Sequence, residues 1–542
     1  MGTVFSGRVM EPIDLPARYN ASTTFIDANL RAGRGGKAAV VCGAEELTYA
    51  RVAALVSQVG NALKGLGVRM EERVMLLLPD SPEFVAAFFG AIRLGAVPVP
   101  VNTMLRPYDY EYLLNDSRAT ALIVSEPLYA RIEPVRANLK FLRHLMFVSK
   151  EGGTPRGAID YRACVRDESP DLTPADTSVD DACFWLYSSG TTGFPKGAVH
   201  LQHDMACCAE RYARGVLGIH EQDRMFSVSK LFFAYGLGNA LYFPFYVGAT
   251  TILHPGPPAP LAVYEIATRQ QPTLLFSVPT GYAALLAVPD AEKTYSLRSV
   301  RLCVSAGEAL PKVIYERWRE KWGIEILDGI GSTEVLHIFI SNRPGRVRPG
   351  ASGEVVPGYE AKIVDETDRP VGQGDVGELL VKGDSICALY WNKHQKTKET
   401  IAGEWIRTGD KYLKDADGFY WYQGRSDDML KVGGMWVSPI EVEATLASHP
   451  AVLECGVIGT SDTGELVKPK AFVVLNPGFT PSAALAEELK VFVKEKLAPY
   501  KYPCWIEFIQ ALPKTATGKI QRFKLRELDR TRIHNETTDE RG

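Results

Sequence analysis

Several features are missing from this 542-residue sequence, and each absence excludes a class of protein. The 9 cysteines contain no C-x-x-C pair, so we expect reduced thiols and neither a disulfide framework nor a zinc site. The net charge is −3, so no basic field attracts nucleic acid or an anionic membrane. No segment repeats at a period of about 20–50 residues, which excludes solenoids. These absences predict a cytoplasmic protein that binds no nucleic acid and no membrane.

An uninterrupted apolar run of membrane-spanning length is also lacking. Residues 231–253 are the most apolar stretch, but glycines, Asn239 and Pro244 interrupt it. We therefore expect a buried helix and strand there. Residues 1–7 lack the basic-then-apolar pattern of a signal peptide, so we expect none. The myristoylation pattern at Gly2 is interpreted as coincidence, because no second membrane signal lies nearby.

The sequence does contain short apolar runs that alternate with helical patterns. The strand-like runs are residues 73–78, 96–100, 121–124, 145–148 and 182–186. Strands alternating with helices predict an α/β fold with a substantially parallel sheet. Between residues 350 and 382, short strands separated by Gly, Pro and Asp predict a mostly antiparallel β unit.

A boundary between domains is predicted at residues 424–431, where polar residues separate two short apolar stretches. Beyond it, Ser438 begins a helix with Pro439 in the first turn, and further strands indicate a compact α+β unit. Residues from Arg530 onward are polar, so we expect a frayed tail. The predicted organisation is a large N-terminal domain of α/β subdomains plus a β unit, residues 1–426, and a small mobile α+β C-terminal domain, residues 427–542.

A loop rich in hydroxyls and glycines follows the apolar run at residues 182–186. It is not a Walker A loop, because Pro195 precedes Lys196 and Gly197 follows it. Glycines let a backbone approach a ligand, and successive N–H groups can converge on an anion. A helical pattern over residues 201–216 predicts a strand–loop–helix arrangement. We expect a phosphate chain to bind here, rather than a flexible surface loop, through Ser188, Ser189, Gly190, Thr191, Thr192, Gly193 and Lys196.

Four other residues have both a functional and an ordinary interpretation. Glu334 could share Mg²⁺ with phosphates, or it could be a solvated loop carboxylate. Asp410 lies on a glycine turn suited to a ribose diol, although such turns are common. Arg425 could bind the same sugar or form a surface ion pair. Lys519 lies among other basic residues, where a solvated basic face is the ordinary interpretation.

The motifs together resemble the adenylate-forming superfamily of acyl- and aryl-CoA ligases, luciferases and peptide-synthetase adenylation domains. The resemblance covers nearly the whole chain. Its phosphate-loop signature is matched by residues 188–197, and its other motifs by residues 305–310, 329–334, 408–410, 424–428 and 513–519. One departure is Ile330, which stands where tyrosine is common.

The resemblance implies ATP, Mg²⁺ and coenzyme A as ligands and assigns roles to residues. Catalysis falls to Lys519, which bridges the carboxylate and the α-phosphate, to Glu334 as the Mg²⁺ ligand, and to Thr191. The implied nucleotide-binding residues are Gly307, Glu308, Ala309 and Asp328 around adenine, Gly329, Ile330 and Thr333 in the second signature, and Asp410 and Arg425 at the ribose. The small domain would rotate about Asp427 and bring Gly433 and Gly434 to a thiol tunnel.

Residues 231–248, 328–338 and 498–525 resemble benzoate–CoA ligases in particular. A flat ring requires thin apolar walls with few polar groups. The implied acid-binding residues are Phe233, Ala234, Tyr235, Gly236, Gly329, Gly331, His337 and Ile338, although ordinary core packing also explains some of the aromatic ones.

The resemblance therefore implies an AMP-forming aryl-CoA ligase that converts benzoate, ATP and CoA through an aryl-adenylate. Open alternatives are 2-aminobenzoate, a hydroxybenzoate, a medium-chain fatty acid, an adenylation domain that feeds a carrier protein, and a non-enzymatic acyl-CoA or nucleotide sensor. A Rossmann dehydrogenase is excluded, because Gly236 and Gly238 lack the third glycine. A homodimer and acetylation of Lys519 are left open.

Overall fold

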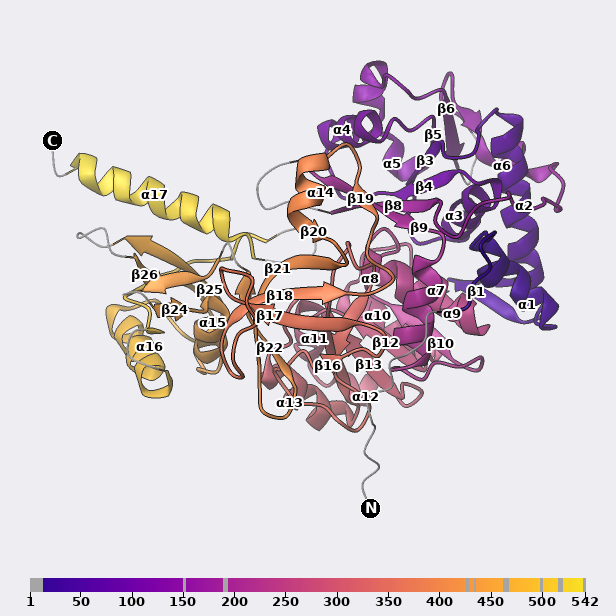
Figure 1. Ribbon diagram of the computed structural model, residues 1–542. Helices are drawn as coiled ribbons and strands as arrows, with labels where there is room; N and C mark the ends of the chain where they lie inside the picture. Colours follow the sequence, from indigo (N-terminus) through magenta and orange to yellow (C-terminus); the bar gives the residue numbers. More distant parts are fainter. Residues whose placement is uncertain are drawn as a thin grey trace. The chain divides into compact units, whose positions relative to one another are not determined.

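The structure is a computed structural model that describes residues 13–149, 153–188, 194–425, 428–432, 435–461, 467–497, 501–514 and 520–539 (Figure 1). The chain divides into two compact units. Unit 1 comprises Met1–Leu310, Ile314–Ala361 and Val381–Ile406, and unit 2 comprises Pro311–Val313, Lys362–Leu380 and Arg407–Gly542. The predicted hinge, Asp427, lies outside the described residues, so the boundary at residues 426/427 stays a prediction.

The main sheet of unit 1 has nine strands in the order β16-β15-β14-β13-β12-β10-β11-β1-β2. Its central pairs are parallel, whereas β1–β2 at one end and β14–β15–β16 at the other are antiparallel. The strands are β1 (Ala38–Cys42), β2 (Glu45–Thr48), β10 (Arg224–Ser227), β11 (Thr250–Leu253), β12 (Leu274–Ser277), β13 (Leu302–Ser305), β14 (Ile326–Gly331), β15 (Ile338–Ser341) and β16 (Glu354–Val355). The predicted α/β alternation is confirmed.

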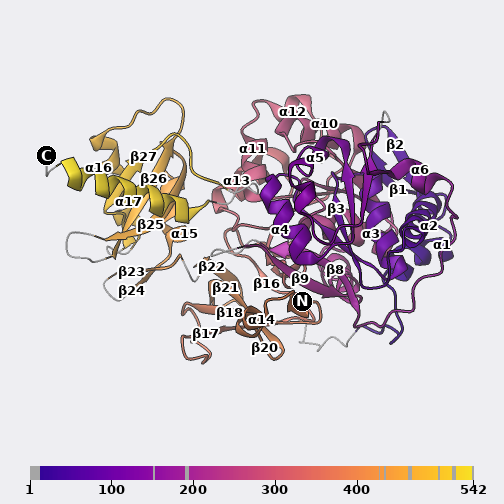
Figure 2. The ribbon, with the colours of Figure 1, turned by 90° about the horizontal axis from the view of Figure 1, so that it is seen from above.

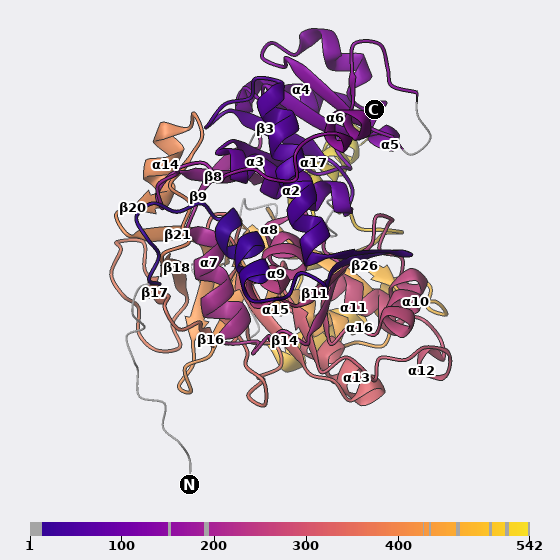
Figure 3. The same cartoon turned by 90° about the vertical axis from the view of Figure 1, so that its right-hand side faces the viewer.

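A second sheet of unit 1 is entirely parallel, in the order β4-β3-β5-β6-β7. Its strands are β3 (Arg73–Leu77), β4 (Val97–Pro100), β5 (Ala121–Ser125), β6 (His144–Val148) and β7 (Ile159–Asp160). Helix α2 (Tyr49–Gly65) packs against α3 (Pro82–Leu94), as Figures 2 and 3 both show. Helix α3 begins where Ser81 Oγ accepts a hydrogen bond from Phe84 N at 3.4 Å.

Strand β8 (Ala182–Ser188) pairs antiparallel with β9 (Lys196–Leu201), and β9 also pairs with β19 (Leu389–Tyr390). The predicted strand–loop–helix arrangement is therefore wrong. The phosphate-loop motif connects two strands of a hairpin, and α7 (Asp204–Cys208) begins only afterwards. Of the residues in the helical pattern, Leu201 is the last residue of β9, whereas Met205, Cys208 and Tyr212 lie in helical turns, so the helix exists but begins one strand later than predicted.

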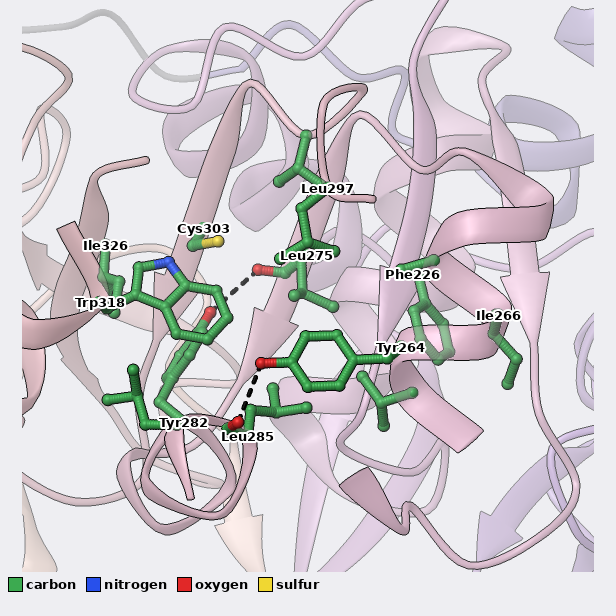
Figure 4. Packing of buried hydrophobic residues seen from close by; sticks show 14 of the residues in the cluster. Phe226, Tyr264, Ile266, Leu275, Tyr282, Leu285, Leu297, Cys303, Trp318 and Ile326 are labelled. Carbon is green, nitrogen blue, oxygen red and sulfur yellow. Dashed lines mark hydrogen bonds between the residues drawn. The ribbon is translucent and has the colours of Figure 1, made fainter. Parts of the chain in front are cut away.

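Aromatic side chains fill the core on one face of the main sheet (Figure 4). Tyr264 OH donates to Leu285 O at 2.9 Å, and Tyr282 OH donates to Leu275 O at 3.1 Å. Buried hydroxyls need such partners, because an unpaired polar group in the core is destabilising. Trp318 from α13 (Lys312–Trp322) packs edge-on against Tyr282. This core fixes the strands whose ends carry the predicted adenine-side residues.

Unit 2 contains a three-stranded sheet, β25 (Val452–Ser461), β26 (Val467–Leu475) and β27 (Trp505–Phe508), and a hairpin of β23 (Leu430–Val432) and β24 (Met435–Val437). Helix α15 (Pro439–Ala447) begins at Ser438, whose Oγ accepts from Glu441 N at 3.2 Å as predicted. Helices α16 (Ala483–Lys496) and α17 (Arg522–Asp539) complete the unit. The prediction of a frayed tail from Arg530 onward is wrong for the backbone, because α17 continues to Asp539.

A five-stranded sheet follows the α/β part in the sequence, as expected, but the first strand of the predicted β unit, Glu354–Val355, pairs with β15 in the main sheet instead. Its strands are β17 (Glu360–Val364), β18 (Gly377–Lys382), β20 (Ile401–Ala402), β21 (Trp405–Lys414) and β22 (Tyr420–Arg425). Strand β21 pairs antiparallel with β20 and β22. The remaining helices are η1 (Thr23–Asp27), α1 (Ala28–Arg31), α4 (Pro107–Ser117), α5 (Glu126–Tyr129), η2 (Glu133–Asn138), α6 (Tyr161–Arg166), η3 (Ala209–Arg214), α8 (Ala234–Leu237), η4 (Gly238–Tyr242), α9 (Phe243–Val247), α10 (Pro260–Gln270), α11 (Pro279–Leu286), α12 (Ala291–Thr294) and α14 (His394–Thr400).

The apolar stretch at residues 231–253 forms α8, η4, α9 and β11, so the predicted buried helix and strand are confirmed. Within the described ranges, no helix combines the length and apolar character that crossing a bilayer requires.

Candidate functional site

The phosphate-loop motif is anchored at both ends by paired residues. Ser188 at the end of β8 lies opposite Lys196 at the start of β9. Ser188 Oγ is buried and has no hydrogen-bond partner among the described residues, so a ligand oxygen could satisfy it. After the loop, the Phe194 ring stacks on Tyr112 of α4, with 4.6 Å between centroids, and Tyr112 OH donates to Pro195 O at 3.0 Å. Ser189, Gly190, Thr191, Thr192 and Gly193 lie outside the described residues, and their roles stay predictions.

The second glycine motif begins in the last three residues of β14, which pairs antiparallel with β15, and continues into the segment between these strands. A Cβ at Gly329 would lie 2.8 Å from Ile338 Cγ2, and one at Gly331 would lie 2.6 Å from His337 O. Real Cβ atoms do not come so close to other atoms, so these two positions require glycine. Ile330 lies between them in the same strand. The structure thus brings the predicted nucleotide segment into direct contact with His337 and Ile338 of the predicted acid-binding set.

Glu334 is held by contacts from the segment before β19 and from β19 itself. Tyr390 OH donates to Glu334 Oε1 at 2.7 Å, and Cys387 N donates to Glu334 O at 2.7 Å. The Lys196 ammonium lies 4.7 Å from the centroid of the Tyr390 ring. Burial and the Glu334 carboxylate raise the pKa of Tyr390 well above its ordinary value, so the hydroxyl keeps its proton. Sequence reasoning missed Tyr390, because no motif we considered includes it.

A second missed group ties β9 to the Glu334 segment. His200 Nδ1 lies 2.7 Å from Asp204 Oδ2, and its Nε2 lies 2.8 Å from Thr333 O. Both side chains are 0% exposed. The imidazole therefore connects the strand after the phosphate loop to the backbone beside Glu334. The only signal in the sequence is the i,i+4 spacing of His200 and Asp204, which many helices and turns share.

The adenine-side turn has the backbone that its glycine predicts. Gly307 has φ +92°, a conformation that favours glycine, and Glu308 and Ala309 follow it. Asp328 lies within the neighbouring strand, β14, and accepts from Leu310 N at 3.2 Å through Oδ2. Its Oδ1 is buried with no partner in the described part of the chain. Burial raises the pKa of Asp328 to about 8, so the carboxyl is largely protonated at neutral pH.

The predicted ribose residues form a pair within unit 2. Asp410 and Arg425 lie opposite each other on β21 and β22, and Arg425 Nη1 donates to Asp410 Oδ1 at 3.0 Å and to Thr408 O at 3.1 Å. Gly409 has φ +73°, and a Cβ there would lie 2.9 Å from Arg425 Nη2. This turn fixes Asp410 and Arg425 together, as a site for two vicinal hydroxyls requires.

The predicted acid-binding residues come from α8 and the residue before it, from β14, and from the start of β15 with the preceding His337. Tyr235 OH donates to Ser277 O at 3.2 Å and to Val304 O at 3.1 Å, which fixes that ring. His337 Nε2 lies 3.3 Å from Tyr235 O and 3.2 Å from Asn239 Oδ1, both acceptors, so Nε2 carries the proton. Burial lowers the pKa of His337 to about 3, so the ring is neutral. Its Nδ1 is left as an acceptor with no described partner.

The backbone around His337 also depends on small residues. A Cβ at Gly238 would lie 2.4 Å from His337 Cδ2, and one at Gly236 would lie 2.1 Å from Lys230 O. Phe233 precedes α8 and packs against Phe232 at 4.4 Å, so this aromatic pair also contributes to packing. Ala234 and Ile338 are buried beside these residues.

Mg²⁺ fits the residues present only if a substrate supplies further ligands. No cluster of three or more His, Cys, Asp or Glu side chains suited to a metal occurs among the residues searched, which are the described ones. Mg²⁺ is commonly held by one or two carboxylates plus phosphate oxygens, and Glu334 can provide one such carboxylate. Lys519, Gly433 and Gly434 lie outside the described residues, as does Asp427, and their roles stay predictions.

Comparison with protein families identifies the chain. Residues 28–391 match the model described as AMP-binding enzyme, and residues 441–519 match the AMP-binding enzyme C-terminal domain. The chain belongs to the AMP-binding enzyme family, the adenylate-forming superfamily. The predicted family and the α/β fold with a large N-terminal and a smaller C-terminal domain are thereby confirmed.

Characterised relatives of this family member match over nearly the full length. A benzoate–CoA ligase of Thauera aromatica is 50% identical over 516 residues, which is 95% of this chain and 97% of the relative. A 4-hydroxybenzoate–CoA/benzoate–CoA ligase of Rhodopseudomonas palustris is 45% identical over 516 residues, 95% of each chain.

Solved structures of CoA ligases are similar to this chain over nearly its full length. That of the anthranilate CoA ligase AuaEII in complex with anthranoyl-AMP has a TM-score of 0.92 and 48% identity, covering 97% of this chain and 100% of that one. A benzoate CoA ligase from Burkholderia xenovorans has a TM-score of 0.87 and 45% identity, covering 94% of this chain and 100% of that one.

Proposed function

We propose that this chain is an AMP-forming aryl-CoA ligase whose first substrate is benzoate. It would convert an aromatic acid, ATP and CoA to an aryl-CoA, AMP and diphosphate. The observation that carries the proposal is the contact between the two acid-binding segments, in which His337 Nε2 reaches Tyr235 O at 3.3 Å beside glycines that admit no Cβ. Thin, rigid and mostly apolar walls suit a flat ring. The 50% identity to a benzoate–CoA ligase supports the same class.

In the first half-reaction the aryl carboxylate attacks the α-phosphorus of ATP, and diphosphate leaves. Both reactants are anions, so catalysis depends on positioning and charge neutralisation. Lys519 would neutralise the charge that develops between the carboxylate and the α-phosphate. Ser188 Oγ and the Lys196 ammonium flank the loop that would hold the departing phosphates. Mg²⁺, when bound by Glu334 and phosphate oxygens, would lower the negative charge of the triphosphate.

In the second half-reaction the CoA thiolate attacks the carbonyl of the aryl-adenylate, and AMP leaves. The C-terminal domain would first rotate about Asp427. Gly433 and Gly434 would then border the thiol tunnel, where the absence of side chains leaves room for the pantetheine arm. Asp410 and Arg425 would hold the ribose through both steps, because their pairing depends only on β21 and β22.

A second candidate substrate is 2-aminobenzoate. The neutral His337 ring offers Nδ1 as a buried acceptor without a described partner, which favours a substrate carrying an N–H donor. The 48% identity to an anthranilate CoA ligase supports this candidate. One such contact changes discrimination by only about 1–3 kcal/mol, so both acids remain in the proposed class.

ATP–diphosphate exchange over a panel of benzoates and of C4–C10 aliphatic acids tests the proposal. We expect exchange with benzoate and with at least some of its amino or hydroxy derivatives. Exchange with aliphatic acids alone would refute the aryl specificity, and exchange with no acid would favour a sensor.

The role of Lys519 is tested separately by Lys519→Ala. We expect adenylate formation to slow about 10²–10³-fold, the scale of losing one preorganised donor. Thioester formation from a supplied aryl-adenylate should be spared. An equal loss in both half-reactions would contradict the assigned role.

A further inference from the structure

The position of Tyr390 is fixed by strand pairing and by burial, independently of its contacts with Lys196 and Glu334. It lies in β19, opposite Ala198 of β9, two residues after Lys196. Its backbone N donates to Thr397 Oγ1 at 3.0 Å, and the residue is only 3% exposed. A buried side chain on a paired strand has little freedom to rotate or shift. The ring and hydroxyl therefore occupy a defined position beside the phosphate-loop hairpin.

Two oppositely charged groups of the proposed nucleotide site contact different parts of this side chain. The Lys196 ammonium lies 4.7 Å from the ring centroid, where the negative face of the ring attracts a cation. The hydroxyl donates to Glu334 Oε1 at 2.7 Å, a charge-assisted hydrogen bond. Lys196 and Glu334 are far apart in the sequence, so Tyr390 is one physical link between the first and second signatures.

Without the hydrogen bond from Tyr390, the Glu334 side chain could adopt several rotamers, because it is only partly buried. Its backbone is held by Cys387 N, which donates to Glu334 O at 2.7 Å, but a backbone contact does not orient a carboxylate. The Tyr390 hydroxyl does orient the carboxylate, because its hydrogen bond to one carboxylate oxygen also fixes the direction in which the other oxygen points. A ligand group that must be held in a narrow geometry gains affinity from such preorganisation.

We propose that Tyr390 is a positioning residue for nucleotide binding, orienting the Glu334 carboxylate through its hydroxyl and the Lys196 ammonium through its ring. The proposal rests on the proposed function, in which these two charged groups serve the phosphates of ATP. It assigns the hydroxyl and the ring separate effects. The hydroxyl affects only the part of nucleotide binding that depends on a divalent cation, whereas the ring affects the cation-independent part through Lys196.

Calorimetric titration of the full chain with α,β-methylene-ATP, in Mg²⁺ and in EDTA, separates these effects. We expect Tyr390→Phe to weaken binding about tenfold in Mg²⁺, the scale of one hydrogen bond to a charged group, and less than twofold in EDTA. Tyr390→Leu should weaken binding in both conditions. The KM for benzoate should stay within twofold for Tyr390→Phe, because that side chain has no role in the acid pocket.

The matched control is Tyr264→Phe, which removes a buried hydroxyl that donates to Leu285 O at 2.9 Å in the core shown in Figure 4. Its nucleotide affinity should equal that of the wild type in both conditions. A double-mutant cycle gives a second measurement. Glu334→Gln alone should reproduce the Mg²⁺-specific loss, and adding Tyr390→Phe to it should cause little further loss.

Three outcomes would overturn the proposal while leaving the proposed function intact. The first is Mg²⁺-dependent binding by Tyr390→Phe that matches the wild type. The second is an equal loss of affinity in Mg²⁺ and EDTA, and the third is full additivity with Glu334→Gln, since either indicates general distortion. Failure of the wild type to bind the analogue more tightly in Mg²⁺ would instead refute the metal role of Glu334, and the proposal with it.

Discussion

Asp328 provides a sharp test of the buried site, because its protonation differs between the folded and unfolded chain. The side chain is 3% exposed, and burial raises its pKa to about 8 from the ordinary value of 3.8. The folded state therefore binds the proton more tightly. Between these two values the unfolded chain has lost a proton that the folded chain keeps. The free energy of unfolding must then fall as pH rises through that window, and become independent of this group above it.

The magnitude follows from the width of the window. A rise from 3.8 to about 8 is roughly four pH units, and each unit corresponds to about 1.4 kcal/mol, so the full effect is about 6 kcal/mol. Asp80 offers a comparison, because burial raises its pKa only to about 6, against the attraction of Lys230. Its effect should be complete near pH 6. Of these two carboxyls, only Asp328 should still titrate from pH 6 to 8, with an effect of roughly 2–3 kcal/mol.

The assay compares the apparent melting temperatures of the wild type, Asp328→Asn and the control Asp80→Asn, without nucleotide, in steps from pH 5 to 9. Asparagine keeps an acceptor for Leu310 N and cannot ionise. We expect Asp328→Asn to gain roughly 2–5 °C over the wild type between pH 6 and 8, whereas the Asp80→Asn difference stays flat there. A flat difference for Asp328→Asn over this range would refute the argument. So would a parallel rise for the control, because it would indicate an effect common to both variants.

Three further substitutions test other parts of the structure. Gly238→Ala places a Cβ within 2.4 Å of His337 Cδ2, so the KM for benzoate should rise about tenfold or more while the KM for ATP is unchanged; equal changes in both would argue against a local effect. Arg522→Met leaves the Glu443 carboxylate, which Arg522 Nη2 contacts at 2.7 and 2.8 Å, buried without its partner, and urea unfolding should show a loss of about 3–5 kcal/mol. A loss below about 1 kcal/mol would mean that the charge is solvated. Asp427→Pro should preserve ATP–diphosphate exchange and abolish thioester formation, and retention of both activities would exclude a hinge at this residue.

Local patterns in the sequence were enough to predict most strands and helix starts. The buried strands and the cap at Ser438 depend on neighbouring residues, so their signals are contained in short windows. Strand β9 was missed although its main partner, β8, lies just across the loop, because the residues after the loop were assigned to the helical pattern that begins at Leu201. Helical spacing over residues 201–216 then appeared to begin directly after the loop. The hairpin partner across the loop decided the structure of residues 196–201, and the helical pattern holds only from Asp204 onward.

The candidate site likewise contains residues that the sequence predicts and contacts that it does not reveal. Glycine positions such as Gly329 and Gly331 carry their constraint in their residue type, and motifs expose them. Tyr390 acts on Glu334 across 56 positions of the sequence, and His200 reaches Thr333 across 133, so no local spacing marks either contact. The partners of these two side chains could be found only in three dimensions.

The contact of His200 has a consequence for how such an enzyme can change its substrate. Its acceptor is the backbone carbonyl of Thr333, not a side chain. Replacing the side chains that follow, including those at His337 and Ile338, leaves this acceptor in place as long as the backbone keeps its course. Evolution could therefore change the preferred aromatic acid without breaking the link between the backbone at Thr333 and strand β9. In laboratory evolution, libraries that vary the acid pocket should retain nucleotide affinity more often than libraries that vary His200 or Asp204.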